Sequence, residues 1–268
     1  MKLSETNLGF IGAGNMASAL MRGLIAAHVP ASRIFAVDVD AAKLSVLTQE
    51  LGISSVQSVD ELVARCDVIL VATKPSVVLE VLQGRPGTGP LFISIAAGIT
   101  LGQLEGAFAG PARVVRAMPN TAALVAEAAT GFCGGHHLRA GDLELAEQLL
   151  GVVGLCVRVE EKMLDAVTGL SGSGPAYVML VIEAMADGGV RAGLPREVAL
   201  RLATQTVRGA ATLVQQTGKH PAELKDMVTS PGGTTICGVQ VLEQRGIRGA
   251  FIDAVQAATL QSSALSKK

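Results

Sequence analysis

The chain has 268 residues, enough for one large domain or two smaller ones. Its 22 Lys and Arg residues against 23 Asp and Glu residues leave a net charge of −1, which lacks the basic excess of nucleic-acid-binding domains. Six Phe, one Tyr and no Trp are too few aromatic side chains for a surface that stacks bases or sugars.

The chain is also unusually apolar. Charged residues make up 17% of it, against about 25% in average domains, and its mean hydropathy is +0.45. No stretch has the roughly 18 uncharged apolar residues of a membrane span, and the most apolar stretch contains Glu183 and Asp187. Gly12 and Gly14 lie where a secretory signal would have its apolar run, so we expect no secretory signal. We therefore predict a cytoplasmic protein, outside the membrane, with a large apolar subunit interface.

Short β-branched runs alternate with helical patterns in the first part of the chain. We predict strands at residues 7–11, 33–37, 67–73, 91–95 and 113–118, and two more at 130–133 and 155–159. Helical periodicity covers residues 16–27, 41–51, 59–64 and 76–82. Most of these strands are continuous apolar runs, which is typical of a parallel sheet covered on both faces. Residues 1–160 are therefore predicted to form a doubly wound α/β sheet.

The strand pattern stops after residue 160, with no linker-like composition at the boundary. We predict helices at residues 162–170, 176–191, 196–216, 222–228, 235–244 and 248–264. Gly218, Pro221, Pro231 and Gly232 separate several of them. Residues 161–268 are therefore predicted to be an all-α domain, apolar enough to hold subunits together.

The cysteines show no metal-binding pattern. Cys66, Cys133, Cys156 and Cys237 form no Cys-x-x-Cys pair and have no zinc-ligand spacing with histidine. We expect small buried side chains in a reducing compartment, and no metal site. The adjacent residues His136-His137 lie in a polar stretch that we interpret as a solvated loop.

Residues 12–17 follow the first predicted strand and open a helix with the pattern Gly-x-Gly-x-x-Ala. Gly12 permits a tight turn, Gly14 lets the backbone approach a pyrophosphate, and Ala17 lets the helix pack on the strand. The start of the helix offers free N–H groups to phosphates. An ordinary tight turn is the alternative, but a position at the head of a βαβ series favours a Rossmann-type dinucleotide site.

Other residues at strand ends fit the same ligand. Asp38 ends the second predicted strand, where an acid usually bonds the ribose hydroxyls and repels a 2′-phosphate. This favours NADH over NADPH, but weakly, because Lys43 lies a turn further on; a solvated turn residue is the alternative. Thr73-Lys74-Pro75 and Ala96-Ala97-Gly98 also follow predicted strands, at the edge where doubly wound sheets bind ligands.

Two Gly-rich interruptions of the helical half, residues 169–175 and 230–235, also contain Ser or Thr. Consecutive N–H groups in such turns bind a carboxylate or phosphate, and helix capping by Ser or Thr is an equal alternative. Neither interruption contains His, and the chain has no Gly-x-Ser-x-Gly nucleophile turn. Reduction of an imine with a nicotinamide cofactor therefore fits better than reduction of a ketone, which needs a proton donor.

At these residues the sequence resembles the pyrroline-5-carboxylate reductase family, along nearly the whole chain. The resemblance rests on residues 10–16, 74–75, 94–98 and 116–121, and most specifically on residues 165–177 and 224–235. It implies a Rossmann domain followed by an all-α dimerisation domain, in a homodimer that often assembles into a decamer. It also implies the last step of proline biosynthesis, in which NAD(P)H reduces 1-pyrroline-5-carboxylate to L-proline.

The resemblance further implies the site residues. Ser230, Gly233 and Thr234 would hold the substrate carboxylate, mostly through backbone N–H groups, and the Thr235 hydroxyl would bond the ring nitrogen as the catalytic group. Glu161 matches a family position near the substrate. Together with the turn and Asp38, the predicted cofactor lining comprises Gly12, Ala13, Gly14, Asn15, Met16, Thr73, Lys74, Pro75, Ala96 and Ala97.

Two other functions compete with this one. The β-hydroxyacid dehydrogenase family shares the two-domain plan and carries Gly-x-x-Gly-x-Gly-x-x-x-Lys-x-x-x-Asn. Here the Lys and Asn positions are Val178 and Ile182, so the chemical residues of that family are absent. A non-catalytic dinucleotide sensor is the second alternative, but a sensor has no need of a second ligand-binding turn at residues 230–235.

Overall fold

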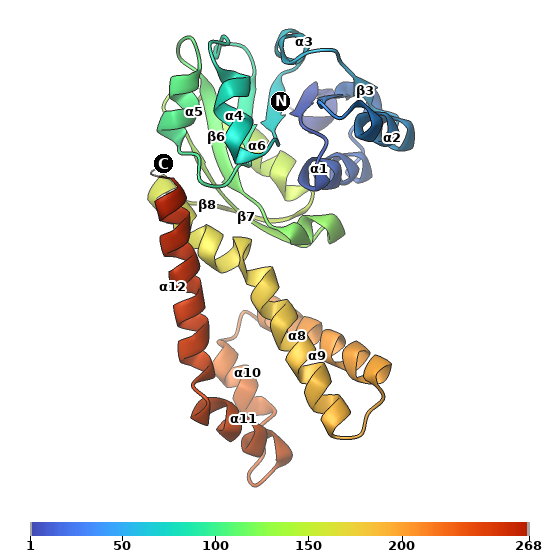
Figure 1. Cartoon of the computed structure of the whole chain (residues 1–268), viewed down its shortest axis with the longest axis vertical. Helices are drawn as coiled ribbons and strands as arrows, with labels where there is room; N and C mark the ends of the chain where they lie inside the picture. Colours follow the sequence, from blue (N-terminus) through green and yellow to red (C-terminus); the bar gives the residue numbers. More distant parts are fainter. Residues whose placement is uncertain (1, 267–268) are drawn as a thin grey trace. The chain divides into compact units, whose positions relative to one another are not determined.

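The computed structural model describes residues 2–266 (Figure 1). Contacts within the chain divide it into two compact units. Unit 1 comprises the described residues up to Ser173 and those from Ala257 onward, and unit 2 comprises Gly174–Gln256. The dinucleotide-type turn belongs to unit 1, and the Ser230–Thr235 turn belongs to unit 2.

Unit 1 is built on an eight-stranded sheet of order β3-β2-β1-β4-β5-β6-β7-β8. All neighbouring strands are parallel except β6 and β7. The antiparallel pair departs from the predicted parallel sheet, because residues 119–127 are too few for a crossover of about a dozen residues. The strands are β1 Leu8–Ile11, β2 Ile34–Val37, β3 Ser54–Ser55, β4 Val68–Val71, β5 Leu91–Ser94, β6 Arg113–Met118, β7 Ala128–Gly134 and β8 Gly154–Arg158.

The carboxyl ends of four strands meet at one edge of this sheet. Ile11 at the end of β1 pairs with Val37 of β2 and with Val71 of β4, and Val71 pairs with Ser94 of β5. The strand order reverses between β1 and β4, which opens a crevice between the loops that follow them. The predicted cofactor residues all follow these four strand ends.

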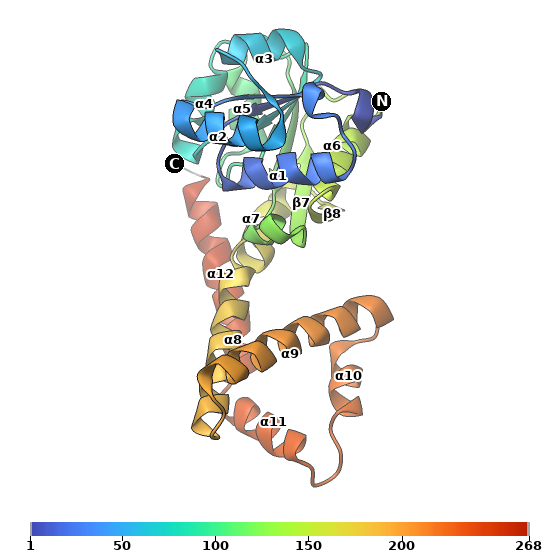
Figure 2. The ribbon, with the colours of Figure 1, turned by 90° about the vertical axis from the view of Figure 1, so that its right-hand side faces the viewer.

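Helices cover both faces of the sheet, as predicted (Figures 1 and 2). Leu8 and Phe10 point into one core with α1, α2 and α6, while Ile11 and Ile69 point into the other with α3, α4 and α5. The helices are α1 Asn15–Ala26, α2 Ala41–Leu51, α3 Val59–Arg65, α4 Pro75–Leu82, α5 Leu101–Ala107 and α6 Asp142–Gly151.

One strand and two α-helices of unit 1 were not predicted: β3, α5 and α6. β3 has two residues, too few for a periodic signal. Gly102 and Gly106 weaken the helical pattern of α5, whose start is instead fixed by a capping box between Thr100 and Gln103. α6 follows Gly141, which has a positive φ of 89°, directly after the stretch that we interpreted as a loop.

The Gly-rich residues 169–175, which were predicted to interrupt the helices, instead continue a helical path. The chain passes from α7 (Leu164–Val167) through a π-helical turn at Thr168–Gly172 into α8 (Gly174–Arg191), and Ser173 N donates to Thr168 O at 2.8 Å. Two contacts join this segment to residues 118–120 at the end of β6. Asn120 Nδ2 donates to Ser171 O at 2.9 Å, and a Cβ on Gly172 would lie 2.8 Å from Met118 Cε.

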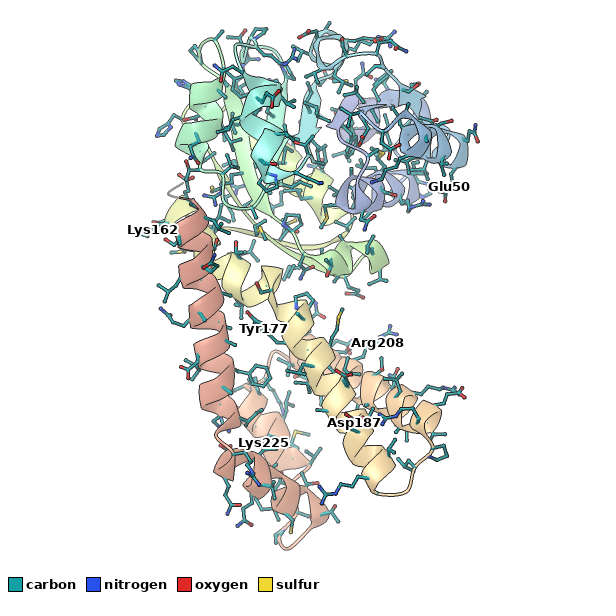
Figure 3. All side chains as sticks on the ribbon, viewed as in Figure 1. Glu50, Lys162, Tyr177, Asp187, Arg208 and Lys225 are labelled. Carbon is teal, nitrogen blue, oxygen red and sulfur yellow. The ribbon has the colours of Figure 1, made fainter. Side chains whose placement is uncertain are left out.

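Unit 2 is entirely helical, and its own core is small. Figure 2 shows α9, α10 and α11 as separate helices joined by loops. Among its described residues, the buried apolar side chains are Ala186, Ala199, Ala203 and Leu224. The Tyr177 hydroxyl donates to Ala254 O at 3.4 Å, between α8 and α12 (Figure 3). The further helices of unit 2 are α9 Arg196–Thr217, α10 Pro221–Met227 and α11 Thr234–Gln244. Helix α12 spans Ile247–Leu265, and its residues up to Gln256 belong to unit 2.

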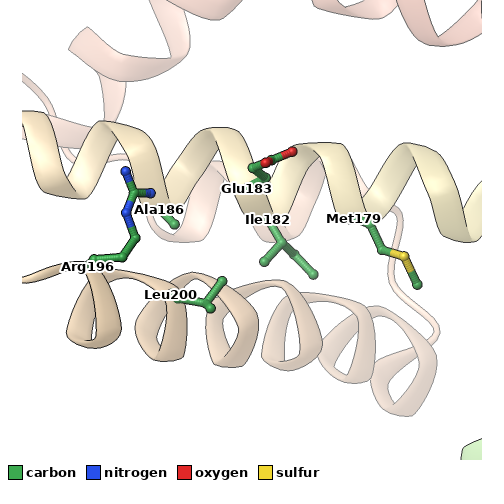
Figure 4. A pocket seen from close by; sticks show the side chains of 6 residues that line it. All are labelled: Met179, Ile182, Glu183, Ala186, Arg196 and Leu200. Carbon is green, nitrogen blue, oxygen red and sulfur yellow. The ribbon is translucent and has the colours of Figure 1, made fainter.

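An open apolar hollow of about 380 Å³ lies between α8 and α9 (Figure 4). Met179, Ile182 and Leu200 line it, with Glu183 and Arg196 at its sides. Many larger apolar side chains of unit 2 are exposed, among them Leu180 and Ile252 at 66% and 68%. The high mean hydropathy of the chain is therefore explained partly by a two-sided sheet and partly by helices with uncovered apolar faces.

The cysteines follow the prediction only in part. Cys66 and Cys133 are buried, and burial raises their pKa values to about 12 and about 11, so both thiols stay protonated. Cys156 is partly exposed and Cys237 is exposed on α11, contrary to the expected burial. The polar stretch with His136 is a solvated loop as predicted. Within residues 2–266, no helix is long and apolar enough to cross a membrane.

Candidate active site

The turn after β1 requires glycine at its first position. Gly12 has a φ of +103°, and a Cβ there would lie 2.8 Å from the carbonyl oxygen of Ala72. Ala72 follows β4, so the loops at the ends of β1 and β4 approach each other directly. Gly12 therefore allows the backbone to turn at the strand crevice without a steric clash.

Gly14, in contrast, faces open space. Apart from its chain neighbours, no atom of the described residues lies within 4 Å of the position of its Cβ, and Gly14 is the N-cap of α1 without any side-chain cap. The N–H groups of the first turn, which includes Asn15 and Met16, have no acceptor within the helix. Free N–H groups beside an empty surface at a helix start fit the pyrophosphate of a dinucleotide.

Asp38 lies beside the same turn. Its Oδ2 accepts a hydrogen bond from Ala13 N at 2.5 Å, and its Oδ1 accepts one from Asp40 N at 2.8 Å. Each carboxylate oxygen accepts about two hydrogen bonds, so acceptor capacity remains for a ribose hydroxyl. Val39, the residue between Asp38 and Asp40, is fully exposed. Sequence reasoning placed Asp38 near the cofactor but did not predict that it also holds the turn.

The loops after β4 and β5 form the other side of the crevice. The buried Thr73 Oγ1 has no hydrogen-bond partner in the described part of the chain, as expected of a group that awaits a ligand. Lys74 is the exposed N-cap of α4 and Pro75 is its first residue. After β5, Ala96 is buried at 5% exposure and Ala97 is partly exposed. These residues fit a nicotinamide dinucleotide bound across the crevice.

Glu161 makes contacts that the sequence did not indicate. Its Oε1 accepts hydrogen bonds from Leu101 N at 2.6 Å and from Arg116 Nη1 at 3.1 Å. The Arg116 side chain is 7% exposed, and that of Glu161 is 37% exposed. Arg116 lies within the family motif at residues 116–121, and an arginine flanked by apolar residues in β6 could have indicated a buried partner.

The Ser230–Thr235 turn lies in unit 2 and leads into α11. Gly232 has a φ of +67°, and Gly233 N donates to Ser230 O at 3.1 Å. A Cβ on Gly233 would lie 2.4 Å from Ser230 Oγ, so a larger residue would displace that hydroxyl. No side chain caps α11, which removes the capping alternative and leaves the N–H groups at Thr234 and Thr235 without an acceptor in the helix. Such a turn can bind an anion.

Comparison with known proteins identifies the family. The family described as pyrroline-5-carboxylate reductase dimerisation matches residues 161–265, and the family described as NADP oxidoreductase coenzyme F420-dependent matches residues 7–98. A pyrroline-5-carboxylate reductase of Methanosarcina acetivorans is 48% identical over 270 residues, which cover 99% of this chain and 100% of the relative. The chain belongs to the pyrroline-5-carboxylate reductase family.

Solved reductases of this family share the fold as well. The pyrroline-5-carboxylate reductase of Coxiella burnetii has a TM-score of 0.92 at 35% identity, covering 98% of this chain and 99% of that one. The Plasmodium falciparum pyrroline carboxylate reductase, solved with NADP bound, has a TM-score of 0.85 at 31% identity, covering 99% and 100%. The predicted Rossmann-type sheet, the helical dimerisation domain and the NAD(P)H-dependent oxidoreductase class are confirmed.

Proposed function

We propose that this reductase converts 1-pyrroline-5-carboxylate to L-proline with NADH or NADPH, the last step of proline biosynthesis. The observation that carries the proposal is the 48% identity to a pyrroline-5-carboxylate reductase over essentially the full length of both chains. Both ligand-binding turns of the family motif are present in full, the one at Gly12–Ala17 in unit 1 and the one at Ser230–Thr235 in unit 2.

On the cofactor side, the residues divide by the loop on which they lie. The turn of Gly12, Ala13 and Gly14 is proposed to hold the pyrophosphate through the backbone N–H groups of Gly14, Asn15 and Met16, because Gly12 N and Ala13 N already bond Val37 O and Asp38. The loops after β4 and β5 are proposed to line the nicotinamide half, with Thr73 Oγ1 supplying a free hydrogen-bonding group. The lining residues of those loops are Thr73, Lys74, Pro75, Ala96 and Ala97. Asp38 is proposed to favour NADH weakly.

On the substrate side, Ser230, Gly233 and Thr234 are proposed to hold the carboxylate, mainly through N–H groups at the start of α11. The Thr235 hydroxyl is proposed as the catalytic group, which orients the ring by a hydrogen bond at its nitrogen. When bound, the cofactor supplies a hydride to the imine carbon. The protonated imine is already electrophilic, so the protein mainly needs to align it. Glu161 is proposed to lie near the substrate without bonding it directly.

The helical half is proposed to serve assembly as well as substrate binding. In this division of labour, residues 1–160 bind the dinucleotide and residues 161–268 dimerise and bind substrate. The uncovered apolar faces of unit 2 support a homodimer as the basic form, and a decamer is the proposed further assembly. The proposed compartment is the cytoplasm.

The test is a turnover assay of the purified protein with 1-pyrroline-5-carboxylate, run separately with NADH and with NADPH. Loss of the reduced nicotinamide absorbance and formation of proline are the expected results. No loss with either cofactor would reject the reductase assignment. Small hydroxyacids with NAD⁺ serve as a control for the β-hydroxyacid dehydrogenase alternative, and robust turnover of them would also contradict the proposal.

A further inference from the structure

Residues 96–101 form the loop that connects β5 to α5, and we call it the β5–α5 loop. Ala96 and Ala97 at its beginning are proposed cofactor-lining residues. Gly98 in its middle has a φ of +77°, and the loop ends at Leu101, the first residue of α5. The position of its backbone therefore determines where the nicotinamide half can lie.

Glu161 holds the end of this loop. Its Oε1 lies 2.6 Å from Leu101 N, a short hydrogen bond of the kind that a charged acceptor forms with a backbone donor. The neighbouring N–H of Thr100 already bonds the Gln103 side chain in the capping box. Leu101 N has no acceptor within its own helix, so Glu161 supplies the acceptor from 60 residues further along the chain.

Arg116 fixes Glu161 relative to the start of the loop. In the sheet Arg116 of β6 pairs with Ser94, the last residue of β5, from which the loop departs. Its guanidinium donates to the same Glu161 oxygen at 3.1 Å. The Arg116 side chain is 7% exposed, and a charge so buried requires a charged partner. The Arg116–Glu161 ion pair thus links β6, which lies beside the beginning of the loop, to Leu101 at the end of the loop.

The middle of the loop is covered by the end of α12. A Cβ on Gly98 would lie 3.5 Å from Leu265 Cβ. α12 is held there by the buried Ser262, whose hydroxyl donates to Asp165 Oδ1 at 2.7 Å. Asp165 lies four residues after Glu161. The segment after β8 therefore holds the β5–α5 loop twice, through the Glu161 bond to Leu101 N and through the Asp165 bond to Ser262.

We propose that Glu161, held by Arg116, is a positioning residue that sets the affinity of the enzyme for its nicotinamide cofactor by fixing the β5–α5 loop. The inference rests on the proposed cofactor site. It places the effect of Glu161 on cofactor binding, through Leu101 N, and not on direct contact with the substrate.

The experiment compares Glu161→Ala with Glu161→Gln in the full-length protein. The dissociation constants of NADH and NADPH are measured from cofactor fluorescence in the absence of substrate. The substrate KM and kcat are measured separately, by steady-state kinetics at saturating cofactor. Glu161→Ala is expected to weaken the tighter-binding cofactor about tenfold. Glu161→Gln keeps an acceptor for Leu101 N, so a smaller loss of about threefold is expected. The substrate KM should change less than about twofold in both.

Two further variants separate this effect from simple destabilisation. Glu160→Ala removes the neighbouring exposed carboxylate, whose partner is Lys162, and should leave cofactor affinity unchanged. Glu161→Ala leaves Arg116 buried without its partner, so Glu161→Ala/Arg116→Met provides a folded form without the buried charge. That double variant should regain thermal stability but not cofactor affinity.

Unchanged cofactor affinity in Glu161→Ala or in the folded double variant would overturn the inference. A raised substrate KM with unchanged cofactor affinity would do the same and assign Glu161 to the substrate. Cofactor affinity is measured without substrate. Failure of the wild-type protein to reduce 1-pyrroline-5-carboxylate would therefore reject the proposed function. The effect of Glu161 on cofactor affinity would still be measured independently.

Discussion

Asp38 Oδ2 accepts a hydrogen bond from Ala13 N at 2.5 Å, so the acid at the end of β2 is bonded to the phosphate-binding turn itself. The carboxylate thereby keeps a fixed position beside the turn, and in the proposed cofactor site its charge would lie near a 2′-phosphate. The same side chain therefore stabilises the turn and, in the proposed site, affects the preference for NADH over NADPH.

Removing the charge of Asp38 should change that choice. We expect Asp38→Asn to raise the ratio of kcat/KM for NADPH to kcat/KM for NADH about tenfold, or about 1.4 kcal/mol. The Asn oxygen can still accept from Ala13 N, whereas Asp38→Ser loses that bond and should also lower stability. Asp40→Asn, in which one exposed charge is removed two residues away, should shift the ratio less. An unchanged ratio in Asp38→Asn would mean that Asp38 does not face the ribose.

Gly12 and Gly14 should respond differently to alanine. Gly12→Ala brings a Cβ to 2.8 Å from Ala72 O at a positive φ, so we expect a loss of at least about 2 kcal/mol of folding free energy. Gly14→Ala meets no protein atom, so its thermal midpoint should stay near that of the wild type while cofactor affinity falls about tenfold or more. Equal effects on stability, or full cofactor affinity in Gly14→Ala, would contradict this reading of the turn.

The hydroxyl of Thr235 should matter for turnover more than that of Thr234. We expect Thr235→Ala to lower kcat ten- to a hundredfold, about 1.4–3 kcal/mol, because the ring nitrogen loses its orienting hydrogen bond. Thr235→Ser should retain most of the rate. Thr234→Ala, which keeps the backbone N–H, is the matched control. Steady-state kinetics at saturating cofactor and substrate decide this, and a normal kcat in Thr235→Ala would remove Thr235 from the mechanism.

The buried pair of Arg113 and Asp142 should make stability depend on pH. Burial alone raises the pKa of Asp142, but hydrogen bonds from the Arg113 guanidinium and Arg139 N outweigh it, and the pKa lies below its ordinary value of 3.8. The stabilisation is therefore complete above about pH 4 and is lost as the pH falls through the lowered pKa.

Asp142→Asn should lower the free energy of unfolding by about 3 kcal/mol at pH 7, because Arg113 is left buried without its partner. Denaturant unfolding should show that the difference from the wild type shrinks below pH 4. Asp187→Asn breaks an exposed pair with Arg196 and should cost less than about 1 kcal/mol (Figure 3). A difference for Asp142→Asn that persists at pH 2 would refute the assigned cause.

A charge on the uncovered face of unit 2 should disrupt assembly. Ile252 on α12 is 68% exposed in the single chain, and Ile252→Asp would place a carboxylate in an apolar interface. Sedimentation velocity should show a shift from the dimer or larger assembly toward monomer. Val46→Asp changes a side chain of similar exposure, 65%, on α2 of unit 1, and should leave assembly intact. Identical profiles for both variants would exclude Ile252 from the interface.

Local signals sufficed for much of the fold. β1, β4 and β5 were predictable because a strand buried on both faces is a continuous apolar run, and α1 because its start carries the glycine turn. The direction of β7 was not, because it depends on the length of a connection. The π-helical turn at Thr168–Gly172 was not predictable, since the close packing of Gly172 against Met118 leaves no local signal in the sequence.

The site shows the same limit. The turns at Gly12–Gly14 and at Ser230–Thr235 were predictable because the conformation of each short segment depends on its own backbone. The pair of Glu161 and Arg116 was not, because the two residues are 45 positions apart and only the sheet brings them together. The conformation of one such segment can be predicted from sequence, whereas the residues that hold the segment in place are found only from the fold.

The small core of unit 2 has a consequence for the enzyme at low concentration. Two extensive apolar cores hold unit 1 together, whereas the buried cluster of unit 2 consists of Ala186, Ala199 and Ala203 with two partly buried neighbours. Separation of the subunits by dilution should therefore loosen the helical half first. Dilute enzyme would lose turnover while each chain still bound its cofactor, so that activity, and not cofactor binding, would follow the amount of protein in the cell.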